Sequence, residues 1–129
     1  MATAKAVLVI GLDPMRPNFT PPAWAVAAGW TAEKILAAFE ADRQRLEKLG
    51  YYVERCFSDF GDNDDGLVAE KLSQQKFDCV VIGAGIRTDP KRFILFENLI
   101  NLIHAHMPDA KICFNRAPDD TADAALRWL

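Results

Sequence analysis

The chain has 129 residues, half of them apolar, and a net charge of −3. This size and polarity are typical of one globular domain, so residues 1–129 are interpreted as a single domain and a disordered chain is excluded. The negative charge argues against a nucleic-acid partner, which requires a basic face. No apolar run approaches the roughly 18 residues of a membrane span, so no membrane partner is expected either.

The first predicted strand is Ala6–Gly11, a short unbroken apolar run that is typical of a parallel strand buried on both faces. The segment from Met15 to Trp30 is long for a strand-to-helix connection, which usually takes about 2–6 residues. It contains the aromatic residues Phe19, Trp24 and Trp30, and its prolines exclude a regular element from its first half. Three interpretations remain open: a lid over a site, a surface for a partner, or a loop that packs its rings on one end of the sheet.

A long amphipathic helix is predicted between two signals that mark its ends. Thr31 can cap its first turn, and Gly50 suits the left-handed position that commonly follows a helix. The next segment, Tyr52–Phe57, alternates partly between apolar and polar residues. This pattern predicts a strand at or near an edge of the sheet.

The segment Ser58–Gly66 is acidic and rich in turn residues. It only faintly resembles a calcium-binding loop, because the alternating ligand positions and the closing glutamate are absent. Its acidic and amide side chains are instead expected to cap a short helix over residues 66–75, with Asp62 or Asn63 as the capping residue.

The centre of the chain predicts a strand, a glycine turn and a helix in succession. Phe77–Ile82 is a buried strand that leads into Gly83-Ala84-Gly85. Asp89 followed by Pro90 is a strong helix start, because the aspartate can cap the helix and proline loses no hydrogen bond at the first position. The helix is expected to continue to Met107, where the following proline ends it.

The last predicted elements are a strand at Ala110–Asn115 and a helix from Pro118 to Trp128. Strands and helices thus alternate along the whole chain, which is typical of an α/β fold with a parallel sheet. Right-handed crossovers favour a three-layer sandwich, with a four-stranded parallel sheet of order 2-1-3-4 and helices on both faces. This arrangement is flavodoxin-like or Rossmann-like.

In such folds ligands bind beyond the carboxyl ends of the strands, where the strand order reverses. Here that crevice lies between the first and third strands, and the long loop leaves from the same rim. We therefore predict two sets of site residues. The ligand-binding set is Asp13, Gly83, Gly85, Arg87 and Asn115, and the lid set is Phe19, Trp24 and Trp30.

The glycine turn predicts a small anionic ligand, because backbone N–H groups and the charge of Arg87 would meet there. Simple turn geometry is the commoner reason for two glycines, and the turn lacks the third glycine of a dinucleotide fingerprint. Asp13 could act as a base or orient a ligand, but it equally suits the cap of a turn before Pro14. The sequence contains no recognisable nucleophile and base pair, so no catalytic residue, reaction or cofactor is assigned.

The helix Phe93–Met107 is apolar over about half of its circumference, more than a helix lying on a sheet requires. The surplus either packs on a neighbouring helix or forms a homodimer contact about a two-fold axis. The second interpretation gives the alternative function, a non-catalytic homodimeric interaction module.

The three cysteines, Cys56, Cys79 and Cys113, each lie within a predicted strand and far apart in the sequence. We expect buried, reduced thiols, and together with the lack of a visible export signal they indicate a cytoplasmic protein. His104 and His106 are two residues apart on a helix and would point to different sides. No metal site is therefore predicted.

Three stretches resemble small bacterial α/β proteins for which no activity is characterised. They are Gly11-Leu12-Asp13-Pro14, the run from Cys79 to Arg87, and Cys113-Phe114-Asn115 with Pro118, Asp120, Thr121 and Ala122. The resemblance covers nearly the whole chain. It implies a compact cytoplasmic α/β domain and carries no activity.

Overall fold

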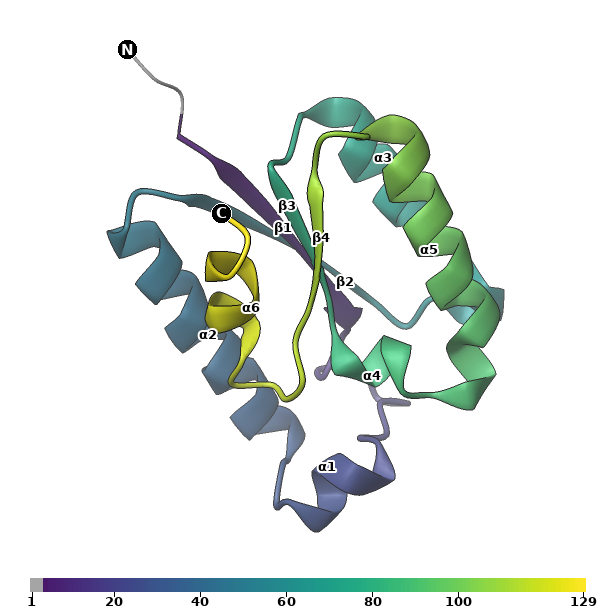
Figure 1. Cartoon of the computed structure of the whole chain (residues 1–129). Helices are drawn as coiled ribbons and strands as arrows, with labels where there is room; N and C mark the ends of the chain where they lie inside the picture. Colours follow the sequence, from purple (N-terminus) through teal and green to yellow (C-terminus); the bar gives the residue numbers. More distant parts are fainter. Residues whose placement is uncertain (1–3) are drawn as a thin grey trace.

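The computed structural model describes residues 4–129, apart from the side chain of Asp62. It contains a four-stranded sheet with all strands parallel in the order β2-β1-β3-β4, which confirms the predicted topology (Figure 1). The strands are β1 (Ala6–Leu12), β2 (Tyr52–Ser58), β3 (Cys79–Ile82) and β4 (Lys111–Phe114).

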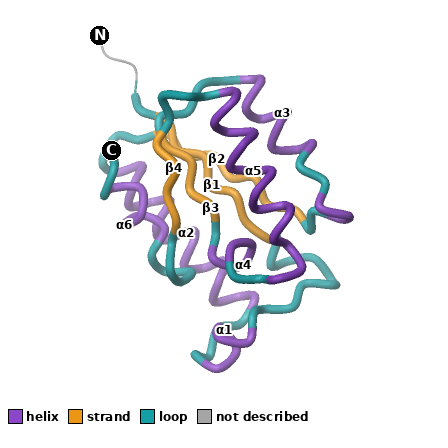
Figure 2. The backbone as a smooth tube through the Cα atoms, turned by 45° about the vertical axis from the view of Figure 1, so that its right-hand side comes forward, coloured by secondary structure: helices purple, strands orange, loops and turns teal. Residues whose placement is uncertain are grey.

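Helices cover both faces of the sheet and form a three-layer sandwich. Figure 2 shows α2 and α6 on one face and α3 and α5 on the other. Their bounds are α2 (Ala32–Lys48), α3 (Gly66–Gln74), α5 (Phe93–His106) and α6 (Thr121–Leu126). Two short helices, α1 (Ala23–Ala27) and α4 (Ala84–Arg87), lie at the carboxyl end of the sheet. No helix within residues 4–129 is long and apolar enough to cross a membrane.

The unbroken apolar run of β1 supplies both halves of the core. Leu8 and Ile10 pack toward α3 and α5, whereas Val7 and Val9 pack toward α2 and α6. All four side chains are buried, because successive residues of a strand point to opposite faces and both faces are covered by helices. β1 and β3 therefore form the centre of the molecule.

The predicted helix signals act as expected at α2. The hydroxyl of Thr31 accepts a hydrogen bond from the Lys34 N–H at 3.2 Å, and Gly50 has a φ of +94° after the last turn. Asn63 does not cap the short helix α3 as predicted. The N-cap residue is Asp65, whose side chain makes no capping hydrogen bond, and Asp64 accepts from the Gly66 N–H at 2.8 Å in a turn just before the helix. The alternative cap, Asp62, lies outside the described side chains.

The prediction of one continuous helix from Pro90 was wrong in its first turn. Asp89 does cap this turn, and its carboxylate accepts from the Lys91 N–H at 2.9 Å. However, the Arg92 N–H bonds to the Asp89 carbonyl, three residues back, so Pro90–Arg92 is a 3₁₀ turn and α5 begins at Phe93. The last helix is also shorter than predicted, since α6 spans only Thr121–Leu126.

Asp42 of α2 connects the two helices on one face of the sheet. Its carboxylate accepts a hydrogen bond from the N–H of Ala122, in the first turn of α6, at 2.9 Å. Burial raises the pKa of Asp42, although the hydrogen bonds from Ala122 and Thr121 act in the opposite direction. The folded protein thus binds the Asp42 proton more tightly than the unfolded chain does.

A raised pKa in the folded state means that stability is lost as the pH rises through that pKa. Asp42→Asn keeps an oxygen acceptor for Ala122 without a charge. We expect its free energy of unfolding to equal or exceed that of the wild type at neutral pH. The wild type should lose stability relative to Asp42→Asn as the pH rises above the ordinary aspartate pKa of about 3.9. Urea unfolding at a series of pH values measures both effects.

The matched control is Asp42→Ala, which removes the acceptor and should be less stable than Asp42→Asn by about 0.5–2 kcal/mol at every pH, as the loss of a helix cap predicts. Equal destabilisation by asparagine and alanine at neutral pH would contradict the pKa argument, because the charge itself would then be stabilising.

Candidate functional site

A pocket lies at the carboxyl ends of β1 and β3, where the sequence placed the crevice. Gly11 and Leu12 from β1, and Gly83 and Gly85 after β3, contribute to its walls. The space that admits water-sized spheres is about 90 Å³. A single water needs roughly 10–15 Å³ on such a measure, so the pocket has room for several waters or one small organic molecule.

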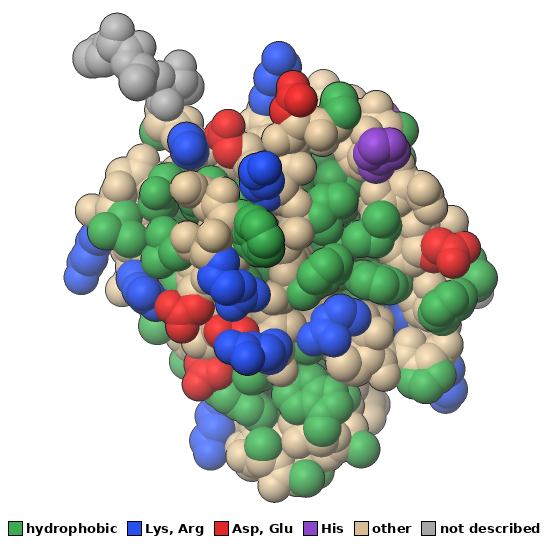
Figure 3. Space-filling model, in the orientation of Figure 1, with side chains coloured by type: hydrophobic (Ala, Val, Ile, Leu, Met, Phe, Trp, Pro, Cys, Tyr) green, Lys and Arg blue, Asp and Glu red, His purple; other side chains and the backbone are tan. Residues whose placement is uncertain are grey.

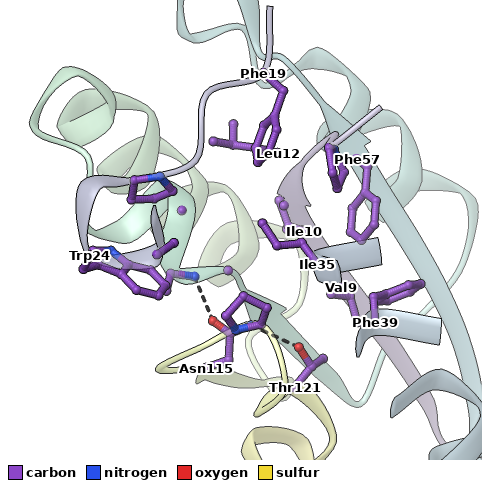
Figure 4. A pocket seen from close by; sticks show the side chains of 18 residues that line it. Val9, Ile10, Leu12, Phe19, Trp24, Ile35, Phe39, Phe57, Asn115 and Thr121 are labelled. Carbon is purple, nitrogen blue, oxygen red and sulfur yellow. Dashed lines mark hydrogen bonds between the residues drawn. The ribbon is translucent and has the colours of Figure 1, made fainter. Parts of the chain in front are cut away.

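The walls of the pocket are almost entirely apolar. Ile35 and Phe39 from α2 and Phe57 from β2 stand on one side, and Trp24 of α1 stands on the other (Figure 4). The rings of Phe39 and Phe57 meet edge to face with their centroids 4.8 Å apart. This contact fixes the wall, because edge-to-face aromatic pairs prefer a defined geometry.

The polar end of the pocket is formed by Asn115, directly after β4, and Thr121, the first residue of α6. The Oδ1 atom of Asn115 accepts a hydrogen bond from the Ala84 N–H at 2.7 Å, and its Nδ2 donates to the Thr121 hydroxyl at 3.0 Å (Figure 4). Asn115 and Thr121 are only 6% and 3% exposed. The bridge therefore holds three segments together at the base of the pocket.

The Pro/aromatic loop, residues 14–30, covers the pocket from outside. Its short helix α1 is fastened by the Trp24 indole N–H, which donates to the Thr88 hydroxyl at 3.0 Å. That hydroxyl donates in turn to the Ala84 carbonyl at 2.6 Å, so the loop is connected to the glycine turn. Among the predicted lid residues, Phe19 and Trp24 line the pocket and Trp30 does not.

The five predicted ligand-binding residues are only partly brought together. Gly83, Gly85 and Asn115 line the pocket, but Asp13 and Arg87 do not. Asp13 caps its own turn: its Oδ1 accepts from the Met15 N–H at 2.9 Å. Arg87 turns toward the end of β4 and donates from Nη2 to the Asn115 carbonyl at 2.9 Å.

Several backbone N–H groups of the glycine turn donate hydrogen bonds to acceptors within the protein. The Ala84 N–H bonds to Asn115, and the N–H groups of Ile86 and Arg87 bond to the Gly83 carbonyl at 3.1 and 3.2 Å. These three N–H groups are therefore committed to partners within the protein and are not offered to an anion.

Thr121, Ile35 and Phe57 line the pocket, and sequence reasoning did not select them. The position of Thr121 could have identified it as a pocket residue, because it closely follows a strand that ends beside the crevice. Ile35 and Phe57 had no such signal, since each belongs to a periodic apolar pattern that predicts core packing as well as a site.

The cysteines are free and buried, as predicted, but two of them meet. The Sγ atoms of Cys79 and Cys113, on the neighbouring strands β3 and β4, are 3.1 Å apart. The hydrogen bond to Cys113, together with burial, raises the pKa of Cys79, and burial raises the pKa of Cys56 to about 11. The same hydrogen bond lowers the pKa of Cys113. Within residues 4–129 no group of three or more His, Cys, Asp or Glu side chains could hold a metal ion.

Comparison with known proteins gives this site no assignment. No family model matches the sequence, and no curated protein shows significant similarity to it.

Thr88→Val removes the hydroxyl that fastens Trp24 while it keeps the shape of the side chain. We expect amide hydrogen exchange in α1 to accelerate by a factor of about two to ten, the range that one hydrogen bond contributes. Exchange in β1 and β3 should not change. Thr88→Ser keeps the hydroxyl and is the control, and unchanged exchange of α1 in the valine variant would show that the bond does not hold the loop.

Proposed function

We propose that the protein binds a small organic molecule with an apolar body in the pocket beneath the Pro/aromatic loop. The observation that carries this proposal is the lining. Apart from Asn115, Thr121 and the indole N–H of Trp24, the side chains that line the pocket are apolar. Concave, mostly apolar pockets with a few convergent polar groups are the usual form of small-molecule sites.

The lining favours an apolar body over the phosphate-like anion that the glycine turn predicted. No lysine or arginine lines the pocket, and the Ala84 N–H of the glycine turn donates to the Asn115 side chain. Burying an apolar ring instead gains about 25 cal/mol for each Å² removed from water. The aromatic walls also offer edge and face contacts to a flat ring.

The same lining supports binding rather than acid–base catalysis. None of the residues that line the pocket has a titratable side chain. General acid–base chemistry needs a group with a suitable pKa within hydrogen-bond reach of the ligand. A binding, carrier or sensing role is therefore the function that the pocket supports best.

Toluene is a suitable first probe, because it has an apolar ring and no hydrogen-bonding group. We expect it to shift the backbone amide signals of Gly83 and Gly85, which line the pocket, in a saturable NMR titration. Ala25→Leu should abolish these shifts, because Ala25 lines the pocket, is 1% exposed and would fill the space with a larger side chain.

The matched control is Ala27→Leu, which adds the same atoms to an exposed position of the same helix. It should bind toluene as the wild type does. If toluene causes no saturable shift in the wild type, or if the two variants bind it equally well, the pocket is not a ligand site.

A second candidate function, homodimerisation, is supported by an apolar surface formed by α5 and β4. The edge patch comprises Phe93, Phe96 and Ile100 of α5 with Ile112 and Phe114 of β4, and apolar side chains gather there in Figure 3. Phe93 is 60% exposed, and the others are only partly buried. We propose a second copy of the chain as the occupant, because a two-fold axis beside an edge strand would cover both patches at once.

Sedimentation velocity tests the dimer at micromolar concentration. We expect the wild type to sediment as a dimer and Phe93→Lys to sediment as a monomer. Ile94→Lys is the control, because Ile94 is 54% exposed but lies about 100° away around the helix from Phe93. A monomeric wild type removes this candidate and leaves the ligand proposal untouched.

A further inference from the structure

The polar end of the pocket indicates the chemical class of the ligand, provided that the proposed function holds. The orientation of the Asn115 amide is fixed by its partner. The Ala84 N–H can only donate, so the atom 2.7 Å from it must be the acceptor Oδ1. The donor Nδ2 consequently faces Thr121, and the Thr121 hydroxyl oxygen accepts from it at 3.0 Å.

This arrangement leaves one donor in the pocket without a partner. The Thr121 oxygen is used as an acceptor, but its own proton has no acceptor among residues 4–129. Thr121 lines the pocket and is 3% exposed, so its hydroxyl is enclosed. Water in the pocket can accept this proton. A ligand with an oxygen at this position replaces that water without loss of the hydrogen bond, whereas a ligand without one leaves the donor unpaired.

We infer that the ligand carries an acceptor oxygen, a carbonyl or a carboxylate, at one end of its apolar body. This oxygen accepts the proton of the Thr121 hydroxyl, and the body lies toward Ile10 and Trp24. The Arg87 guanidinium donates to the Asn115 carbonyl at 2.9 Å and does not line the pocket, so it does not favour a carboxylate over a neutral carbonyl.

Toluene, benzamide and benzoate form a matched series of probes. They share the ring and differ in whether an acceptor oxygen, neutral or charged, is attached to it. We expect benzamide to bind the wild type about three- to tenfold more tightly than toluene, the gain from one hydrogen bond. Benzoate should bind less tightly than benzamide, because no lysine or arginine lines the pocket to offset the burial of its charge. Dissociation constants from NMR titration give the ratios.

Thr121→Val and Thr121→Ser test whether the hydroxyl is the donor. Valine places a methyl group where the hydroxyl oxygen lies, so the hydroxyl donor is lost and the Asn115 Nδ2 loses its acceptor while it stays shielded from water. The benzamide-to-toluene ratio should fall to about one in the valine variant and remain in the serine variant. Because each ratio compares two ligands on the same protein, a general loss of stability in a variant cancels.

The outcomes separate this inference from the proposed function. Failure of all three probes to bind overturns the proposed function itself. Toluene binding with no preference for benzamide or benzoate overturns only the acceptor oxygen. A preference that persists in Thr121→Val overturns the role of the hydroxyl. The inference is supported if the wild type and the serine variant bind benzamide more tightly than toluene and the valine variant does not.

Discussion

The side chain of Asn115 holds together the end of the molecule where the pocket lies. Its amide bonds to the turn after β3 on one side and to the first residue of α6 on the other. Its backbone carbonyl also accepts from Arg87 of α4. An aspartate at this position could keep the bridge only if the Thr121 hydroxyl donated to it, because a carboxylate only accepts hydrogen bonds, and it would bury a negative charge.

This bridge depends on the parallel sheet beneath it. In a parallel sheet every strand ends at the same edge, so residues that are far apart in the chain meet there. The glycine turn after β3, Asn115 after β4 and the loop after β1 are brought together in this way. The sandwich supplies a rigid base, and the Pro/aromatic loop is fastened across it mainly through Trp24 and Thr88.

The structure brings only some of the predicted site residues to the pocket, and the two polar residues that it leaves out have something in common. Arg87 was selected because a basic residue near a glycine turn can attract an anion, yet its guanidinium satisfies the Asn115 carbonyl. Asp13 was selected for its position on the rim, yet its carboxylate caps a local turn. A polar side chain beside a pocket often has a partner within the protein, and a sequence does not show which partner is in reach.

Burial within irregular segments was equally difficult to predict. Phe60 lies in an acidic, turn-rich segment, yet it is only 2% exposed and packs in the core beside α3 and α5. It also adopts a left-handed conformation, with a φ of +50°, which few residues other than glycine accept. A single aromatic residue in a turn has no periodicity, so no pattern indicates that it is buried.

The sequence by itself determined the fold class, the strand order and several helix ends. These follow from local properties: unbroken apolar strands, the Thr31 cap and Gly50 at the ends of α2, and the proline that follows Met107 after α5. Only the tertiary structure decided which polar groups are already paired, that Cys79 meets Cys113, and that the crevice is an apolar pocket with the Thr121 hydroxyl at its end. The reason is physical: propensity and periodicity act over neighbouring residues, whereas hydrogen-bond partners and cavities depend on distances between segments that only packing sets.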